Sequence, residues 1–211
     1  TAVGHDLRSP LGSLQAAVEA LQDGVAPDPE RYLRSMGRDI AALHRLVDDV
    51  FLLARLEAGA VEFNYQPVDV TEIADEAIEV LRPTAHRLGV SVELQAPGSI
   101  TTSTAPEALG RVMRNLIDNA IRHSAGSVVV SLQTAPDLQI RVTDDGAGFP
   151  PEFVAKAFDS FTRADAARTR DGSGTGLGLA IAHRFVTALG GSIRAEPGPG
   201  GVVEFSLPAG P

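Results

Sequence analysis

Apolar residues in the first third of the chain recur every three or four positions, which is the spacing of an amphipathic helix. The two stripes are Leu7, Leu11, Leu14, Val18 and Leu21, then Leu33, Met36, Ile40, Leu43, Val47, Val50 and Leu53. A Gly-Val-Ala-Pro-Asp-Pro segment at 24–29 separates them, and Gly59 is typical of a helix stop. The pattern predicts a helical hairpin. One hairpin buries both stripes poorly, so we expect two copies to pair into a four-helix bundle, as a homodimer.

Beyond a connector at about residues 58–68, the pattern changes to short strands alternating with helices, which indicates a separate α/β unit. We therefore divide the chain into units 1–60 and 61–211. Helices are expected at 69–88, 107–123 and 176–189, with a capping box at 104–107. Strands are expected at 90–94, 128–132 and 138–142, the last two antiparallel, and a final hairpin around 197–201.

Composition narrows the classes of partner. The chain has a formal net charge of −9 and a pI near 5.0. This acidic balance does not indicate a protein that binds nucleic acid or an anionic membrane surface through an excess of positive charge. The absence of cysteine excludes disulfides and thiolate metal sites. No apolar run is long enough to span a bilayer and no signal peptide is apparent, so any membrane anchor is expected in other parts of a parent protein.

The helix expected at 107–123 has two distinct faces. Leu109, Met113, Leu116, Ile117 and Ala120 form the apolar one, and Asn115, Asn119, Arg122 and His123 form the polar one. Amide oxygens are hard ligands suited to Mg²⁺, and an arginine suits phosphate oxygens. The alternative is an ordinary solvated face.

Two glycine-rich segments favour a nucleotide site over that alternative. Asp144 closes a strand and is followed by Gly146 and Gly148, so the backbone can approach a flat ligand while the carboxylate accepts a hydrogen bond, for example from an adenine amino group. The segment 172–179 supplies backbone amides where a helix begins, which favours phosphate, and polar residues 162–171 between the two segments predict a lid. A single such loop is more often only a turn.

Four segments in this order resemble the nucleotide boxes of sensor histidine kinases: 115–120 (Asn-Leu-Ile-Asp-Asn-Ala), 144–148 (Asp-Asp-Gly-Ala-Gly), 158–161 (Phe-Asp-Ser-Phe) and 174–179 (Gly-Thr-Gly-Leu-Gly-Leu). The segment 5–11 (His-Asp-Leu-Arg-Ser-Pro-Leu) resembles their phosphoacceptor box. The wider superfamily includes DNA gyrase, heat-shock chaperone ATPases and MutL repair ATPases. The resemblance implies a helical hairpin followed by an α/β two-layer sandwich, with a mixed, largely antiparallel sheet that holds ATP against helices.

The resemblance also implies a role for each matching residue. His5 is implied as the phosphoryl acceptor, and Asp6 as the acid that orients or deprotonates its ring. Asn119 and Asn115 are implied as Mg²⁺ ligands. The implied nucleotide contacts are Asn115, Asn119, Arg122, His123, Asp144, Gly146, Gly148, Arg163, Gly174, Thr175, Gly176, Leu177, Gly178 and Leu179.

Within this set, Asp144 is implied to read adenine and Arg163 to meet the γ-phosphate. Ser9 lies four residues after His5, on the same helical face. The family usually has threonine or asparagine there, implied to orient water for dephosphorylation of the partner regulator. Serine keeps a hydroxyl but departs from that pattern.

These residues predict autophosphorylation of His5 by ATP, followed by transfer to an aspartate of a cognate response regulator. The chain is then the cytoplasmic catalytic part of a bacterial inner-membrane sensor. Two alternatives stay open at this point: a nucleotide-gated scaffold or regulator phosphatase with little kinase turnover, and an ATPase that drives a conformational clamp.

Overall fold

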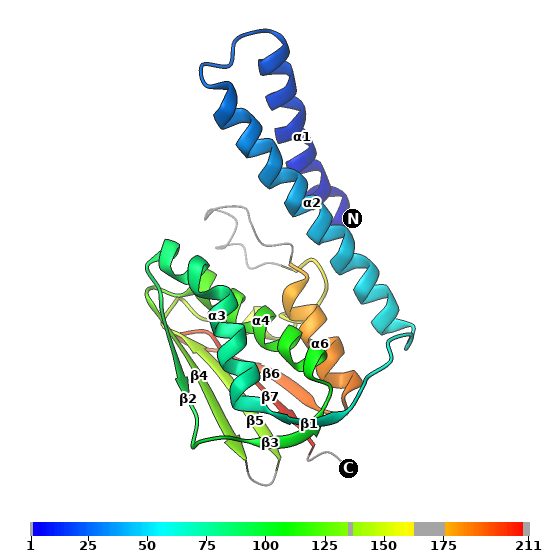
Figure 1. The fold of residues 1–211 in the computed structure, drawn as a ribbon, viewed down its shortest axis with the longest axis vertical. Helices are drawn as coiled ribbons and strands as arrows, with labels where there is room; N and C mark the ends of the chain where they lie inside the picture. The colour runs from blue at the N-terminus through cyan, green and yellow to red at the C-terminus, as the bar shows by residue number, and fades with distance from the viewer. Residues whose placement is uncertain (1, 135–136, 163–175, 209–211) are drawn as a thin grey trace.

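The computed structural model describes residues 2–134, 137–162 and 176–208, with side chains from residue 10 onward. Helices α1 (Ala2–Gln22) and α2 (Pro29–Glu57) form the predicted hairpin, which projects from the rest of the molecule (Figure 1). The Asp28 carboxylate accepts a hydrogen bond from the backbone N–H of Arg31 and so caps the start of α2. Gly59 follows its end at φ +64, a left-handed conformation that favours glycine.

The α/β unit is built on a five-stranded sheet in the order β2-β4-β5-β7-β6. Its strands are β2 (Ser91–Gln95), β4 (Ser127–Thr134), β5 (Leu138–Asp144), β6 (Ser192–Glu196) and β7 (Val202–Leu207). The β2–β4 pair is parallel, and the β4–β5, β5–β7 and β6–β7 pairs are antiparallel. The sheet is therefore mixed and largely antiparallel, as the sequence predicts.

Three helices cover one face of this sheet: α3 (Val70–Leu88), α4 (Pro106–His123) and α6 (Gly178–Ala188) (Figure 1). A short helix, α5 (Pro151–Val154), follows the β5 turn. The strict alternation of β4 and β5 buries one face of each strand, and the apolar arc of α4 packs on it. The buried side chains of this layer include Leu109, Met113, Leu116, Ile117, Val128, Val130, Leu132, Ile140, Val142 and Phe205. The result is the expected two-layer sandwich.

Several sequence predictions are wrong in detail. Residues 104–107 form no capping box, because Ala105 is the N-cap of α4 and makes no side-chain cap bond. Thr104 instead pairs with Gln66 in a two-stranded sheet of β1 (Gln66–Asp69) and β3 (Thr101–Thr104), which the sequence analysis missed. The connector therefore ends before residue 66.

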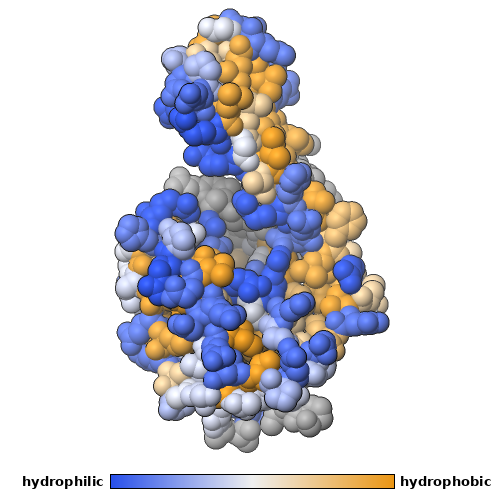
Figure 2. Space-filling model, viewed as in Figure 1, coloured by the Kyte–Doolittle hydropathy of each residue, from blue (hydrophilic) through white to orange (hydrophobic). Residues whose placement is uncertain are grey.

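The hairpin leaves much of its apolar stripe exposed, which is what the predicted dimer requires. Figure 2 shows apolar residues gathered along the hairpin. The exposed large side chains there are Leu11, Val25, Leu33, Ile40, Val47, Val50 and Phe51. The homodimer stays a prediction that this exposure supports.

A network of four charged side chains lies on the other face of the sheet, across β5, β7 and β6. Arg141 on β5 binds Glu196 through two nitrogens, at 2.7 and 3.0 Å, and Glu204 at 2.9 Å. Arg194 adds a 2.7 Å bond to Glu204. These residues face each other across neighbouring strands, so the network supports the register of β5, β7 and β6.

This network predicts loss of stability in acid. The hydrogen bond from Arg141 lowers the pKa of Glu196, so its contribution is present above the ordinary carboxyl pKa and disappears as pH falls through the folded-state value. We expect the free energy of unfolding, measured in urea, to decline below about pH 5. Glu196→Gln should flatten that decline, whereas Glu93→Gln, on the edge strand β2, should not. Equal slopes in both variants would contradict the assignment.

Candidate active site

The polar residues of α4 lie on the side of the helix away from its buried arc, as predicted. Asn115 and Asn119 are partly buried, and His123 is exposed in the last turn. Arg122 is partly buried and forms an ion pair with Asp118, at 2.8 Å from Nε to Oδ2. A basic last turn also complements the helix dipole.

Chain connectivity brings the end of α4 to the glycine turn after β5. A link of only three residues joins α4 to β4, and Val128 near the start of β4 pairs with Asp144 at the end of β5. The turn packs so closely on α4 that a Cβ at Gly146 would overlap the carbonyl oxygen of His123. His123, Asp144 and Gly146 are therefore neighbours, although sequence spacing alone does not show this.

Asp144 is buried and held by backbone on both sides. It is 6% exposed, and its Oδ1 accepts hydrogen bonds from the N–H groups of Gly146 at 2.9 Å and Gly201 at 3.1 Å. Its own N–H donates to the Gly201 carbonyl at 2.8 Å. In the part of the chain that the structure describes, no hydrogen bond reaches Oδ2. The arrangement fixes one carboxylate oxygen and leaves the other to accept from a ligand.

A neighbouring carboxylate, Asp145, fixes the same turn from outside. Its Oδ1 accepts three backbone N–H groups, from Ala125 at 2.8 Å and from Gly126 and Ser127 at 3.0 Å. These hydrogen bonds, that of Ser127 first, lower the pKa of Asp145. The sequence analysis did not predict that Asp145 anchors this turn. The feature of the sequence that could have indicated it is the second aspartate directly after Asp144.

Close approach of neighbouring atoms explains the second glycine of the turn and Gly201 of the β6–β7 hairpin. Gly148 has φ +75, and a Cβ there would overlap the carbonyl oxygen of Gly198. A Cβ at Gly201 would overlap Oδ2 of Asp144. The turn after β5 and the predicted hairpin around 197–201 therefore pack backbone to backbone around one carboxylate. The contribution of Gly201 was not predicted.

The start of α6 completes the group of elements around α4. Leu177 is fully buried and precedes the helix, whereas Gly178 and Leu179 lie in its first turn, so α6 begins two residues later than predicted. A Cβ at Gly178 would lie 4.0 Å from the Cβ and Cγ of Asn115. The Asn115 Nδ2 atom is buried and has no hydrogen-bond partner among the described residues. The unsatisfied Nδ2 is a hydrogen-bond donor, so it fits a ligand that presents an acceptor oxygen or nitrogen to this face of α4.

Several predicted residues fall outside the described part of the chain. Arg163, Gly174 and Thr175 do so entirely, as does the predicted lid apart from Thr162. The backbones of His5, Asp6 and Ser9 lie in α1, but their side chains are outside the described residues. Two described residues on either side of this segment are in contact, because the N–H of Phe161 donates to the Gly176 carbonyl at 3.0 Å.

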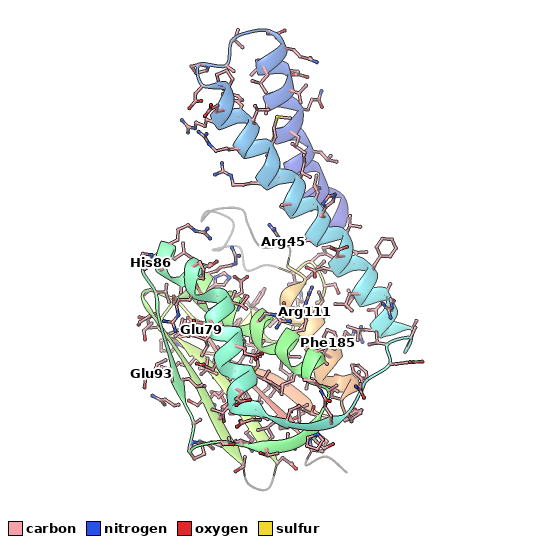
Figure 3. The ribbon with its side chains drawn as sticks, viewed as in Figure 1. Arg45, Glu79, His86, Glu93, Arg111 and Phe185 are labelled. Carbon is pink, nitrogen blue, oxygen red and sulfur yellow. The ribbon has the colours of Figure 1, made fainter. Side chains whose placement is uncertain are left out.

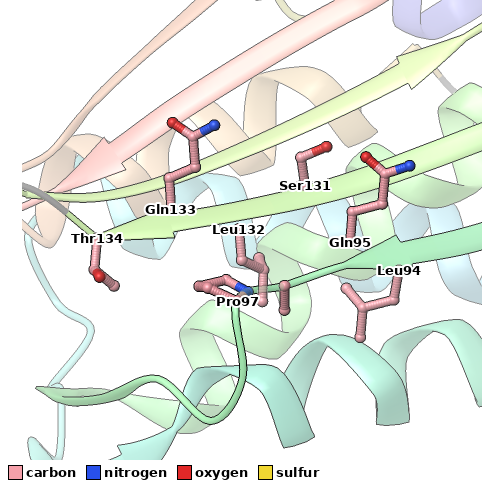
Figure 4. A pocket seen from close by; sticks show the side chains of 8 residues that line it. Leu94, Gln95, Pro97, Ser131, Leu132, Gln133 and Thr134 are labelled. Carbon is pink, nitrogen blue, oxygen red and sulfur yellow. The ribbon is translucent and has the colours of Figure 1, made fainter.

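A shallow depression elsewhere on the sheet is separate from this group. Figure 4 shows it between the ends of β2 and β4, lined by Leu94, Gln95, Ala96, Pro97, Ser131, Leu132, Gln133 and Thr134. Val128 pairs with Asp144, so Thr134 lies at the opposite end of β4. The depression therefore takes no part in the candidate site.

The tight contact at Gly146 gives a sharp mutational prediction. Gly146→Ala should push the turn away from α4 and displace Asp144, and we expect a loss of about 1–3 kcal/mol in the free energy of unfolding. Urea unfolding and nucleotide titration measure the two effects. Gly126→Ala is a matched control, since a Cβ there meets nothing within 4 Å. Similar behaviour of both variants would contradict the close packing.

Comparison with known proteins agrees with this arrangement. The family model described as "Histidine kinase-, DNA gyrase B-, and HSP90-like ATPase" matches residues 104–211, and "His Kinase A (phospho-acceptor) domain" matches residues 1–59. The chain therefore belongs to the histidine kinase family and carries its catalytic core architecture.

Individual relatives support the same assignment. The chain is 36% identical over 223 residues to the signal transduction histidine-protein kinase/phosphatase MprB of Mycolicibacterium smegmatis, covering 97% of this chain and 44% of MprB. The histidine kinase AdeS of Acinetobacter baumannii superposes with a TM-score of 0.83 at 25% identity, covering 97% and 98% of the two chains. Full-length ShkA in complex with AMPPNP gives 0.75 at 27% identity, covering 97% and 44%.

The chain spans less than half the length of the first curated relatives it matches. Within the described residues, no helix is both long enough and apolar enough to cross a membrane.

Proposed function

We propose that this chain uses ATP to phosphorylate His5 and then passes the phosphoryl group to an aspartate of a response regulator. The observation that carries the proposal is the buried, backbone-held carboxylate of Asp144 beside the polar face of α4. A family match to both the phosphoacceptor and the ATPase domains supports the pairing of a histidine with this site.

The described residues suit a nucleotide with a divalent cation. Asp144 is the proposed acceptor for the adenine amino group, with the backbone of Gly146 and Gly148 against the base. The side chains of Asn115 and Asn119 would offer amide oxygens to Mg²⁺, which supplies charge neutralisation for the phosphates when it is bound. Arg122, His123 and the glycine segment at 174–179, with Leu177 and Leu179 in it, are the proposed phosphate-side contacts, together with Arg163. The complex of ShkA with AMPPNP supports an adenine nucleotide as the ligand.

In the proposed reaction, an unprotonated imidazole nitrogen of His5 attacks the γ-phosphorus. The bond from that phosphorus to the bridging oxygen breaks, and ADP leaves with the electron pair. Asp6 holds or accepts the proton of the other ring nitrogen. The transition state is loose, so the protein mainly aligns donor and acceptor and neutralises charge.

The remaining assignments are proposals of the same kind. Residues 1–60 form the dimerisation and phosphotransfer unit, and residues 61–211 form the ATP-binding unit. The partners are a second copy of the chain and a cognate response regulator. We propose a cytoplasmic position within a bacterial inner-membrane sensor, with Ser9 as a residue for regulator dephosphorylation.

Incubation with γ-labelled ATP and Mg²⁺ tests the function directly. We expect one labelled site whose phosphoramidate bond is labile in acid and stable in alkali, and transfer of the label to a receiver domain added afterwards. Steady ATP hydrolysis without protein label would instead indicate the clamp-type ATPase. Nucleotide binding with neither label nor hydrolysis would indicate a nucleotide-gated scaffold.

A further inference from the structure

Two buried hydrogen-bond donors on α4 lack an acceptor. In the part of the chain that the structure describes, three buried side-chain polar atoms have no hydrogen-bond partner, and two of them are Nε of Arg111 and Nδ2 of Asn115. These residues are four apart in one helix, so their side chains lie on the same face, one turn from each other. Buried donors without a partner are rare and costly. Two neighbouring ones indicate a ligand that supplies acceptor oxygens.

The position of Arg111 along α4 indicates which part of the proposed nucleotide it meets. The turn that carries Asp144, the proposed acceptor for adenine, packs against the last turn of α4. The proposed Mg²⁺ ligands Asn119 and Asn115 lie one and two turns nearer the start of the helix, and Arg111 lies a further turn along the same row. A nucleotide whose base lies at Asp144 therefore directs its terminal phosphate toward Arg111.

A contact with α2 holds the guanidinium group of Arg111. Its Nη2 donates to Oδ1 of Asp49 at 2.6 Å, which leaves Nε for another acceptor. Figure 3 shows Arg111 between α4 and α2. A guanidinium group is a planar fork of donors and can bind a carboxylate on one side and a phosphate oxygen on another. The Arg111 side chain is 38% exposed, so a ligand can reach it.

Water is largely excluded from this contact. The Asp49 side chain is 16% exposed, and burial raises the pKa of its carboxyl group even though Arg111 opposes the shift. Charge interactions are stronger in such a place than in solvent. An arginine held there can stabilise negative charge on a phosphoryl group in transfer more effectively than a solvated arginine.

Arg111 also lies close to the level of His5 along the hairpin. The helices α1 and α2 run in opposite directions from one turn (Figure 1). Asp49, the partner of Arg111, is about 20 residues from the start of α2, and His5 is about 17 residues from the end of α1. At 1.5 Å per residue, these positions differ by only about 5 Å along the hairpin. Arg111 is therefore on the side of the ATP site from which the phosphoryl group would leave.

We propose that Arg111 is a further catalytic residue, whose guanidinium group donates to an oxygen of the γ-phosphate of ATP. This inference rests on the proposed kinase function. The bond from the γ-phosphorus to the bridging oxygen breaks and ADP keeps the electron pair, while a bond to a ring nitrogen of His5 forms. Arg111 stays protonated and neutralises charge on the phosphoryl oxygens throughout. Arg111 is not among the nucleotide contacts that the sequence analysis implied.

A comparison of ATP with ADP in the Arg111→Met variant tests the contact. ADP lacks the γ-phosphate, so we expect affinity for ATP to fall about ten- to a hundredfold while affinity for ADP stays unchanged. Calorimetric titrations in the His5→Gln background measure both affinities without consuming ATP. With His5 present, the initial rate of labelling at saturating ATP should fall about a hundred- to a thousandfold. Arg111→Lys keeps a positive charge and should recover part of both losses.

Arg114→Met is the matched control, since it removes another arginine from the same helix. The Arg114 side chain folds back over Gly110, where its Nη1 lies 3.1 Å from the position that a Cβ would take. Ile73 of α3 lies beside the same glycine, so Arg114 is directed toward α3. Its replacement should change neither nucleotide affinity nor the labelling rate.

A double variant separates loss of the phosphate contact from loss of the ion pair. Arg111→Met leaves the Asp49 carboxylate without its partner, and an unpaired buried charge can itself disturb the site. Arg111→Met combined with Asp49→Asn removes that charge. The double variant should show the same selective loss of ATP affinity as Arg111→Met. Recovery of ATP affinity in the double variant would overturn the contact with the γ-phosphate.

The remaining outcomes distinguish this inference from the proposed function. Equal losses for ATP and ADP in Arg111→Met, or no loss for either, overturn the contact, because a contact with the γ-phosphate affects ATP alone. An unchanged labelling rate at saturating ATP overturns the catalytic role. An unaltered chain that binds ATP and is never labelled overturns the kinase function, whereas the ratio of ATP to ADP affinity still decides whether Arg111 meets the γ-phosphate. An unaltered chain that binds neither nucleotide overturns both.

Discussion

His5→Gln should abolish phosphorylation of the chain while leaving nucleotide binding intact. Glutamine has no unprotonated ring nitrogen, so it offers no nucleophile to the γ-phosphorus, and we expect label incorporation to fall by at least about a thousandfold. The substituted residue lies in α1, whereas the proposed ATP contacts all lie between residues 111 and 179 of the sequence. ATP affinity, measured by titration calorimetry, should therefore be unchanged.

His44→Gln is a matched control for this experiment. His44 is an exposed histidine of α2 in the same hairpin, so its replacement makes the same chemical change without touching the proposed acceptor. The control should be labelled at the rate of the unaltered chain. Persistent label in His5→Gln, or its loss in His44→Gln, would place the acceptor elsewhere.

The sequence predicts the parts of the fold that depend on local periodicity. The stripes of the hairpin and the opposite faces of α4 follow from a 3.6-residue repeat, and β4 and β5 follow from strict alternation. The strands β1 (Gln66–Asp69) and β3 (Thr101–Thr104) were not predicted. Each has only four residues, and buried and exposed positions do not alternate along either strand. The sequence analysis assigned Thr104 to the N-terminal cap of the following helix, but in the structure it pairs with Gln66 in a β-strand.

The site was predictable where residue type alone suggests a ligand. Asp144 and the asparagines of α4 stand out as polar groups at the edge of apolar elements. The residues that hold these side chains in place were not predictable in this way. Gly201 donates a hydrogen bond to Asp144 from 57 residues away in the sequence, and Asp145 binds a turn 18–20 residues earlier. The ion pair between α2 and α4 has the same origin, since Arg111 and Asp49 are 62 residues apart. Contacts of that range come from sheet order and helix packing, which no local pattern encodes.

Asp144→Asn should weaken ATP binding strongly without unfolding the protein. The asparagine carbonyl can keep both hydrogen bonds that Oδ1 now accepts from Gly146 and Gly201, so the turn retains its anchor. Its amide group then replaces Oδ2 and presents a donor where the adenine amino group requires an acceptor. Loss of a hydrogen bond to a charged group costs about 1.5–3 kcal/mol, so we expect ATP affinity to fall roughly ten- to a hundredfold.

The comparison of two nucleotides makes this prediction specific to the base. GTP carries a carbonyl where adenine carries its amino group, and the asparagine amide can donate to that carbonyl. The Asp144→Asn variant should therefore lose less affinity for GTP than for ATP. Asp137 is an exposed residue directly before β5, so Asp137→Asn makes the same substitution at the opposite end of the strand and should change neither affinity. Equal losses for both nucleotides in Asp144→Asn would mean that the carboxylate only supports the turn, because a structural role affects every ligand of the site alike.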